Sequence, residues 1–540
     1  MLQLVLGDSR TSVKIVRLLS TTLVAYASWK ILQIGRWIVF GQGRFILFPH
    51  RYNLPPVVPV GRFESLRHLS KEARFPLYQY EYFKKYGPVI IIPFVIPRLL
   101  VVISDPDVAK VVTEGDPQKN IPESDKFLPV YQSFFESFLP TPSMISKATY
   151  SEGPVNGWYW ARKAMAPAFA TNYLSEKLEC LDRTMKKAKL CLDKYDELGQ
   201  DMDLSEFLVI MKRLLRLTLD FICSSMFDFD LNSLDEVFGG DKADGTKFLR
   251  AFQTVIRERT RNYIGPQISF LSYFSKSMRE SLEARKHIAD IGMKILDKFS
   301  KSGTKRDDHS IIGHLVRAPY YSSRQRQERC TDVMIFLLAG HDTTAFSVII
   351  LPAVPELVAD RYFALLSSAG FSSRWRKTLE SPPWWCLLQE ELNKANPENG
   401  FMHKEKLSSL HYLDCVVKEG MRLHPVAPTS SIRVAIADLD FGKCLHEQPP
   451  DIKLDVVTVV IPKGSVCAIS NYSLHRHGIS RPDEFIPERC IGENLAMLEL
   501  KLVLAYMLQK YEFTLVKEPT QIFAMTLKPS GARVTVRARR

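Results

Sequence analysis

The stretch Cys330–Val348, with the sequence CTDVMIFLLAGHDTTAFSV, constrains the fold more than any other part of this chain. Its composition predicts a helix whose apolar residues surround the axis, and a helix of that kind has to be buried by other elements. With 540 residues, of which 46% are hydrophobic, the chain is long enough to build a core that encloses it.

Polar residues interrupt this predicted helix in its middle, at Gly340, Asp342, Thr343 and Thr344. Gly340 removes a side chain, so that another group can approach the backbone. A threonine hydroxyl can bond the carbonyl four residues back and loosen the helix locally. Asp342 and Thr343 form an acid–alcohol pair able to relay protons. From these residues alone, a functional turn and a helix end with polar residues facing solvent are equally good interpretations.

The first 50 residues predict a membrane anchor or an amphipathic segment. A basic flank precedes an uncharged run from Leu18 to Trp29, which is too short to span a bilayer alone. Extension to Phe40 gives enough length but includes Lys30 and Arg36, and a charge near the bilayer centre costs about 3 kcal/mol. We predict a signal anchor or monotopic helix; the alternative is an amphipathic first helix of a soluble domain.

A proline-rich hinge follows at residues 51–61 (RYNLPPVVPVG), where three prolines favour a stiff, extended linker over a helix. It marks the best domain boundary in the chain, so residues 62–540 are predicted to form one domain. That domain begins with two apolar β-type runs, Val89–Val95 and Leu99–Ile103, whose spacing indicates a hairpin.

Helical patterns dominate from about residue 155 to 350, and short strands return around 453–470 and 511–538. Strands near both ends with helices between them predict a fold that is mainly α with small β-sheets. No internal repeat interrupts this order.

Charge and cysteine usage exclude several classes of protein. Lys plus Arg is 72 and Asp plus Glu is 59, which gives a net charge of +13. The basic residues form no tract of the kind that binds nucleic acid, so no nucleic-acid partner is predicted. The nine cysteines are scattered and contain no C-x-x-C pair, so neither a zinc site nor a disulfide framework is expected.

Three further motifs are ambiguous when each is taken alone. Glu419 and Arg422 share one face of a predicted helix, as an ordinary surface ion pair would. Cys490 opens an apolar helix, where the helix dipole favours a thiolate, yet a single cysteine is more often a small buried hydrophobe. Trp158 and Arg162 suit an anionic ligand, but they also suit a core aromatic beside a solvated base.

Together these motifs form an ordered set: W-x-x-x-R, A-G-x-D-T-T, E-x-x-R, P-E-R and C-x-G-x-x-L-A-x-x-E. The set, with the flanking stretches KEGMRLHP, IPKGSV and DEFIPER, resembles the heme-thiolate monooxygenases of the cytochrome P450 family. The resemblance runs from about residue 50 to the end of the chain. It implies the cytochrome P450 fold.

The resemblance implies a role for each matching residue. Cys490 corresponds to the axial thiolate of the heme iron. Asp342 and Thr343 correspond to the pair that delivers protons to bound dioxygen, and Ala339 and Gly340 to the helix bulge over the heme.

Two further groups follow from the same resemblance. Glu419, Arg422 and Arg489 correspond to a structural ion triad that is not catalytic. Trp158 and Arg162 correspond to the pair that holds one heme propionate, and Arg433 is predicted to hold the other.

The implied activity is a monooxygenase reaction on a lipophilic small molecule, in secondary or lipid metabolism. Heme b would be the cofactor, and two electrons would come from NADPH through a partner reductase that docks on a basic face. The implied location is the membrane of the endoplasmic reticulum, with the catalytic domain facing the cytoplasm. Terpenoids, fatty acids and polyketides all stay open as substrates. A peroxide-rearranging member without a reductase is disfavoured, because Asp342 and Thr343 are both present.

The sequence departs from the family pattern at two places. Before the heme cysteine the family carries F-x-x-G-x-R-x-C, but here Arg489 and Cys490 are neighbours and the signature is missing. Because consecutive Cα atoms are only ~3.8 Å apart, Arg489 cannot easily reach the triad while Cys490 reaches the iron. We therefore predict that Arg489 stays near Glu419 or Arg422 and that Cys490 is displaced. The second departure is an atypical insert at 349–385.

One missing loop and one extra segment suggest a common cause, an error in the gene model that retained an intron and skipped an exon end. The alternative is a decayed or repurposed chain. Two functions therefore stay open: an active monooxygenase, and a catalytically inactive, heme-poor member of the same fold. Sequencing the transcript distinguishes the two origins.

Overall fold

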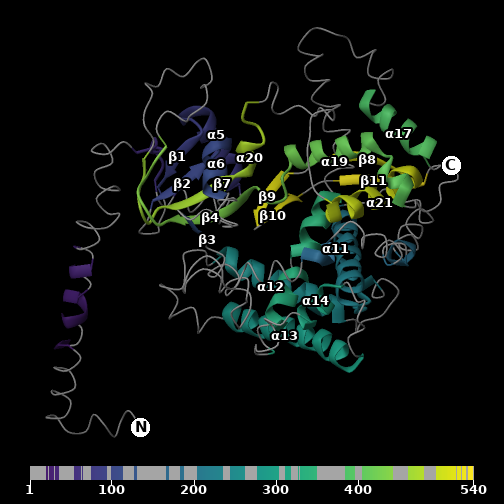
Figure 1. Ribbon diagram of the computed structural model, residues 1–540, viewed down its shortest axis with the longest axis horizontal. Helices are drawn as coiled ribbons and strands as arrows, with labels where there is room; N and C mark the ends of the chain where they lie inside the picture. The colour runs from purple at the N-terminus through teal and green to yellow at the C-terminus, as the bar shows by residue number, and fades with distance from the viewer. Residues whose placement is uncertain are drawn as a thin grey trace, which may run out of the picture.

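The structure is a computed structural model, and Figure 1 shows its arrangement. Four residues with a predicted role, Trp158, Arg162, Arg489 and Cys490, lie outside the described part, as do residues 349–382 of the predicted insert. The described residues are 20–21, 24–29, 31–33, 35, 54–61, 64, 74–93, 99–113, 127–129, 166–169, 180, 183–187, 204–234, 244–261, 276–302, 310–317, 326, 329–337, 339–348, 383–395, 404–441, 460–478, 494–517, 520–524, 526–530 and 533–538.

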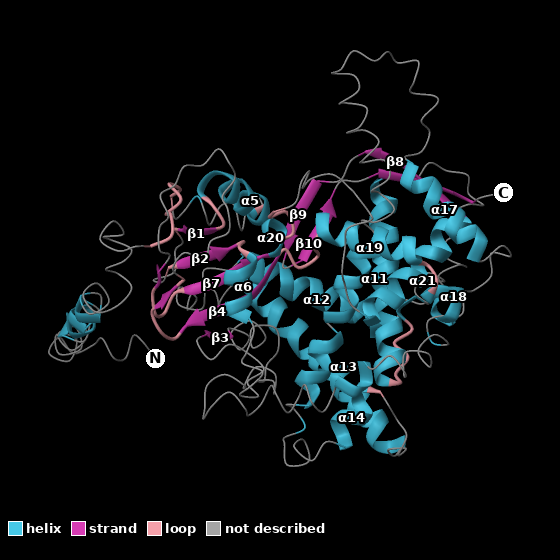
Figure 2. Ribbon diagram, turned by 45° about the horizontal axis from the view of Figure 1, so that its top comes forward, coloured by secondary structure: helices cyan, strands magenta, loops and turns pink. Residues whose placement is uncertain are grey.

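A five-stranded sheet lies at one end of the molecule (Figure 2), with the strand order β1-β2-β7-β4-β3. The predicted hairpin is confirmed, because the first two strands pair antiparallel with Val89 opposite Ile103. Strand β7, which lies next to β2 in this order, runs parallel to it. The strands are β1 (Val89–Ile92), β2 (Leu100–Ile103), β3 (Phe127–Pro129), β4 (Thr429–Ala435) and β7 (Val466–Ser470).

Helices α5 (Phe75–Tyr86), α6 (Pro106–Thr113) and α20 (Asn471–Leu474) lie beside this sheet (Figure 1). The start of α6 has a clear local cause. Asp105 accepts hydrogen bonds from the backbone N–H groups of Asp107 (3.0 Å) and Val108 (2.9 Å), as an N-cap residue does. Pro106 then occupies the first helical position, where its missing N–H costs nothing.

The described part of the proline-rich segment runs along β1. The N–H of Val58 donates to the carbonyl of Ile91 (2.9 Å), and the N–H of Ile91 donates to the carbonyl of Pro56 (2.8 Å). Leu54 and Val58 are buried there. The segment is therefore extended and attached to the sheet, while the predicted division into domains stays a prediction.

The other end of the molecule is mainly helical, so the predicted fold class, mainly α with small β-sheets, is confirmed. Its labelled helices are η2 (Ala166–Phe169), α11 (Leu204–Phe227), α12 (Asp244–Arg261), α13 (Lys276–Ser302), α14 (Ile311–Arg317), α17 (Pro383–Ala395), α18 (Lys404–Ser408), α19 (His411–Leu423) and α21 (Asn494–Lys510). Residues 329–337 and 339–348 are helical too.

Three short strand pairs complete the fold, and they confirm that strands return in the C-terminal part of the chain. The strands are β5 (Leu439–Asp440), which pairs with β6 (Val460–Ile461), β8 (Tyr511–Lys517), which pairs with β11 (Arg533–Ala538), and β9 (Thr520–Ala524), which pairs with β10 (Thr526–Ser530).

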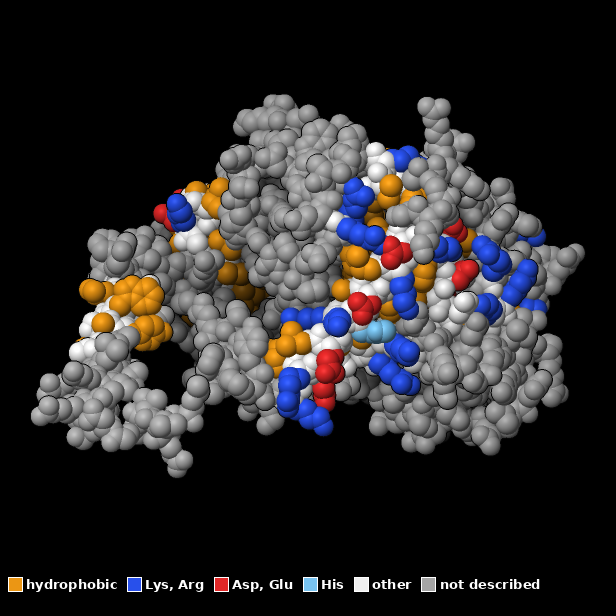
Figure 3. All heavy atoms as spheres, turned by 90° about the horizontal axis from the view of Figure 1, so that it is seen from below, with side chains coloured by type: hydrophobic (Ala, Val, Ile, Leu, Met, Phe, Trp, Pro, Cys, Tyr) orange, Lys and Arg blue, Asp and Glu red, His pale blue; other side chains and the backbone are white. Residues whose placement is uncertain are grey.

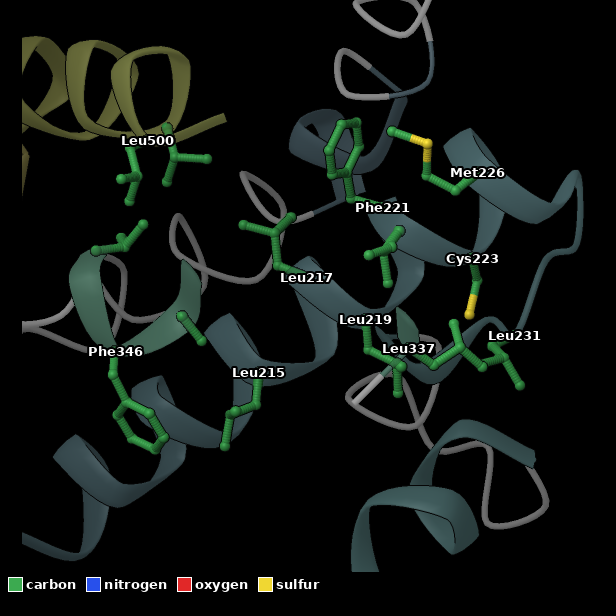
Figure 4. Close-up of a cluster of buried hydrophobic side chains, with 14 of the residues drawn as sticks. Leu215, Leu217, Leu219, Phe221, Cys223, Met226, Leu231, Leu337, Phe346 and Leu500 are labelled. Carbon is green, nitrogen blue, oxygen red and sulfur yellow. The ribbon is translucent and has the colours of Figure 1, made fainter. Parts of the chain in front are cut away.

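The largest hydrophobic cluster surrounds α11. Leu215, Leu217, Leu219, Phe221 and Cys223 are all at most 6% exposed, although they cannot lie on one face of a helix. Side chains from several other helices reach them, as Figure 4 shows. Burying each large side chain contributes about 1.5–3 kcal/mol, so α11 is the centre of the helical core.

The described part of the N-terminal segment is a helix that lies apart from the rest of the molecule in Figure 1. Val24, Tyr26 and Trp29 are more than half exposed, as are Ile31 and Leu32. Within the described residues, none of the helices has the length and apolar composition needed to cross a bilayer.

Candidate functional site

The predicted central helix is buried except for one stripe. Most described residues from 330 to 348 are buried, but Ala339 is exposed and Phe336, Gly340 and Thr343 are partly exposed. These four residues follow the i, i+3, i+4, i+7 spacing of one helix face, which we call the open stripe. The prediction that the helix is enclosed on every side is therefore wrong for this face. Of the residues that interrupt the apolar pattern, Gly340 and Thr343 lie on this stripe.

The threonine hydroxyls of this helix bond its own backbone, as the sequence predicted. The Thr343 hydroxyl donates to the carbonyl of Ala339 (2.7 Å), and the Thr344 hydroxyl donates to that of Gly340 (2.9 Å). Such bonds compete with the helix ladder and loosen it. The two threonines differ in exposure, because Thr343 belongs to the open stripe and Thr344 is only 5% exposed.

Asp342 is buried at 6% exposure, next to Thr343 in sequence but on another side of the helix. The structure therefore presents the alcohol on the open stripe and keeps the acid inside. Their function as a proton relay stays a prediction.

Packing explains why a glycine stands at position 340. A Cβ atom built on it would overlap Cδ1 of Ile222 and lie 3.2 Å from the Cγ1 atom of the same residue. The group that approaches the Gly340 backbone is therefore a side chain of α11. The sequence indicated such an approach but could not say which residue makes it.

Glu419 and Arg422 form a buried, bidentate ion pair within α19. The Arg422 Nε lies 2.7 Å from one carboxylate oxygen of Glu419, and Nη2 lies 2.8 Å from the other. Glu419 is 1% exposed and Arg422 is 8% exposed, so this is not a surface pair. Arg422 also donates from Nη1 to the carbonyl of His475 (3.2 Å). Because Arg489 lies outside the described residues, the predicted triad stays a prediction.

Burial lowers the pKa of His475 beside this pair, and the charges of Arg476 and Arg422 add to the effect. Backbone hydrogen bonds of the imidazole oppose it. Arg476 itself is buried, with its guanidinium 3.9 Å from the ring centroid of Tyr472. The two arginines beside His475 thus disfavour a positive charge on its imidazole ring.

Polar contacts attach α21, the helix that follows Cys490, to its neighbours. Lys501 lies 3.1 Å from a carboxylate oxygen of Asp414 on α19. Gln509 donates to the carbonyl of Leu392 on α17 (2.7 Å). Sequence analysis did not find these contacts, because each joins residues that are far apart in the chain.

The remaining predicted residue, Arg433, is buried at 4% exposure in β4, where it pairs with Cys467 of β7. Its predicted function as a propionate ligand stays a prediction. In the coloured part of Figure 3, Lys and Arg side chains are interspersed with fewer Asp and Glu side chains.

Several cysteines are unsuited to metal binding. Burial raises the pKa of Cys330 and of Cys467 to about 12, and it raises that of Cys223 well above its usual value. These thiols stay protonated, whereas a metal ligand has to be a thiolate. Among the described residues there is no group of three or more His, Cys, Asp or Glu that could hold a metal ion.

Comparisons with known proteins give a consistent result. The sequence profile of the family described as "Cytochrome P450" matches residues 54–350, 380–489 and 489–536. Cytochrome P450 3A30 of Fundulus heteroclitus is 24% identical over 418 residues, covering 69% of this chain and 72% of the relative. A cytokinin hydroxylase of Arabidopsis thaliana is 25% identical over 409 residues, covering 70% of each. A crystal structure of a cytochrome P450, CYP102L1, superposes with a TM-score of 0.65 at 17% identity, covering 90% of this chain and 99% of that one.

Proposed function

The chain belongs to the cytochrome P450 family of heme-dependent monooxygenases, and on that premise we propose that it oxidises a lipophilic small molecule at a membrane surface. One atom of dioxygen would enter the substrate, and NADPH would supply two electrons through a partner reductase. The endoplasmic reticulum, with the catalytic domain on the cytoplasmic side, is the proposed location. The substrate would come from secondary or lipid metabolism.

The open stripe is the observation that carries this proposal. Ala339 offers a small side chain and Thr343 a hydroxyl, and no charged residue belongs to the stripe. A flat, apolar group can approach this face at Ala339 and Thr343, so these two residues fit a heme on this side. When bound, the heme supplies the redox chemistry that splits dioxygen.

The remaining heme contacts are proposed from the motifs. Cys490 would hold the iron as a thiolate, Trp158 and Arg162 would hold one propionate, and Arg433 would hold the other. Thiolate is a soft ligand suited to heme iron. Arg433 is already buried within the sheet, so a nearby anion would stabilise its charge.

The chain's own residues would contribute to the reaction by holding and supplying protons. The Thr343 hydroxyl can hold a proton at the open stripe, and its bond to the Ala339 carbonyl sets the direction in which it points. The buried Asp342 would resupply that proton. Positioned acid and base groups of this kind contribute about 10²–10⁴-fold to a rate.

We propose further that residues are missing between Arg489 and Cys490. Supporting this, the second segment of the family match ends at 489 and the third begins there, while residues 351–379 are outside the match. Because the contact between Lys501 and Asp414 attaches α21 to α19, the loop before Cys490 has to lead into a helix whose place is set.

A carbon monoxide difference spectrum of the reduced protein tests both proposals. The chain as written should incorporate little heme, whereas a version with a family-like loop before Cys490 should show the Soret band of a thiolate-ligated heme. Cys490→Ala in the restored version is the control and should abolish that band. Stoichiometric thiolate-ligated heme in the unrestored chain would refute the missing loop. Absence of the band from the restored chain would instead favour the catalytically inactive alternative.

Membrane association is tested by deleting residues 1–50. Their exposed apolar side chains include Val24, Tyr26 and Trp29, so the truncated chain should leave the membrane pellet while still folding. If it pellets as before after a high-salt wash, these residues are not the anchor.

A further inference from the structure

We propose that Thr218 of α11 is a positioning residue for the turn that presents Ala339 and Thr343. The inference rests on the proposed function, since it concerns how Thr343 is held for proton delivery. It assigns Thr218 no contact with substrate or heme.

The Thr218 hydroxyl connects two helices that are far apart in sequence. It donates to the carbonyl of His341 (2.9 Å), and the carbonyl of Leu215 in its own helix lies farther away, at 3.3 Å. Thr218 is only 1% exposed, so water does not compete for this bond. In Figure 4 the side chains of Leu337 and Phe346, which flank the turn, lie in one cluster with those of α11.

The His341 carbonyl is one of several in this turn that accept a side-chain hydrogen bond. The hydroxyls of Thr343, Thr344 and Ser347 bond carbonyls four residues back, and the His341 ring bonds the Leu337 carbonyl (2.7 Å). Those donors belong to the same helix and move with it. They can loosen the helix, but they cannot fix its place in the protein. The bond from Thr218 can, because its donor belongs to another helix.

Packing holds the same turn from two sides. One turn along α11 from Thr218, Ile222 fills the space left by Gly340. From α12, the rings of Phe248 and Phe252 stand edge-on to His341, with centroids 6.1 Å and 5.1 Å away. These apolar contacts limit how far the turn can shift, but they have no preferred hydrogen-bond direction. A directed hydrogen bond at the His341 carbonyl sets the rotation of the turn, and with it the direction of Thr343.

Hydrogen exchange measured on the full-length chain tests the hydrogen bond between Thr218 and the His341 carbonyl, and this experiment does not require heme. Thr218→Val removes the hydroxyl and keeps the shape, so exchange of the amides in residues 339–348 should become about two- to ten-fold faster. Exchange in the hairpin of β1 and β2 should not change. Thr218→Ser should restore the wild-type rate. Thr254→Val is the matched control, because the Thr254 hydroxyl donates to the Arg250 carbonyl within its own helix, α12 (2.9 Å).

Unchanged exchange in Thr218→Val would overturn the proposal, as would an equal rise in the β1–β2 hairpin, which would indicate general destabilisation. The second readout is the hydrogen peroxide released per NADPH consumed by the loop-restored enzyme. Thr218→Val should raise it at least two-fold and Thr218→Ser should return it to the wild-type level.

The two readouts separate this inference from the proposed function. If the loop-restored Thr218→Val variant shows faster exchange and the restored chain binds no heme, the proposed monooxygenase function is refuted. The hydrogen bond between Thr218 and the His341 carbonyl is still supported. Normal heme binding and faster exchange with unchanged peroxide release would refute Thr218 as a positioning residue for Thr343.

Discussion

Two polar clusters among the described residues are built in opposite ways. In the α19 cluster, Glu419 and Arg422 satisfy each other through two short bonds, and both are nearly inaccessible. In the turn at residues 339–343, hydroxyls bond back onto their own helix and one face stays open. The first arrangement gives rigidity, because every strong group has a fixed partner. The second leaves a hydroxyl that can exchange its partner, which proton transfer requires.

Breaking the α19 pair should have the largest effect on stability. Arg422→Ala leaves the Glu419 carboxylate buried without its bidentate partner, and breaking a buried pair in this way costs about 3–5 kcal/mol. Urea unfolding monitored by tryptophan fluorescence measures the change. Lys394→Ala is the matched control, since the Lys394–Glu390 pair is exposed and its loss should change stability far less. Equal losses in the two variants would contradict the contrast drawn here.

A methyl group at Gly340 should have the next largest effect. Gly340→Ala forces Cβ into Ile222, and overpacking of this kind costs about 1–3 kcal/mol. Ile222→Val removes the overlapping Cδ1 atom, so the double variant should recover part of the loss. Gly61→Ala is the control, because the nearest atom to its Cβ would lie at 3.9 Å, an ordinary contact. Additive costs in the double variant would show that Ile222 is not what Gly340 accommodates.

These two predictions differ in how far the sequence could have anticipated them. The E-x-x-R spacing already placed Glu419 and Arg422 on one helix face, and the β1–β2 hairpin followed from two apolar runs. Such features are local, so a pattern reveals them. Ile222 against Gly340, Thr218 against His341 and Lys501 against Asp414 are contacts between distant segments.

Thr218 in particular carried no sequence signal. It stands in an apolar helix where a threonine is unremarkable, and only the tertiary fold brings it to the His341 carbonyl. The open stripe was missed for the opposite reason. The apolar pattern of residues 330–348 predicted burial on every side, and a pattern cannot show which face of a helix its neighbours cover least.

The smallest expected effect concerns pH and the α19 cluster. The pKa of His475 is lowered by burial and by Arg476 and Arg422, so the unfolded chain binds a proton at higher pH than the folded chain. Stability should therefore be complete above the unfolded value of about 6.5 and fall as the pH drops toward the folded pKa. His475→Gln should flatten this part of the urea-midpoint profile. A profile that stays as steep would assign the slope to other groups.

One comparison of neighbouring threonines tests the proposed function of the open stripe most directly. Thr343 and Thr344 make the same kind of backbone bond, but only Thr343 belongs to the open stripe. In the loop-restored enzyme we would measure the fraction of NADPH electrons recovered as hydrogen peroxide. Thr343→Ala should raise that fraction several-fold, because it removes the hydroxyl that would hold a proton at the open stripe, while Thr344→Ala should leave it near the wild-type level. Equal fractions in the two variants, or an unchanged fraction in Thr343→Ala, would contradict the proposal that Thr343 on the open stripe delivers protons.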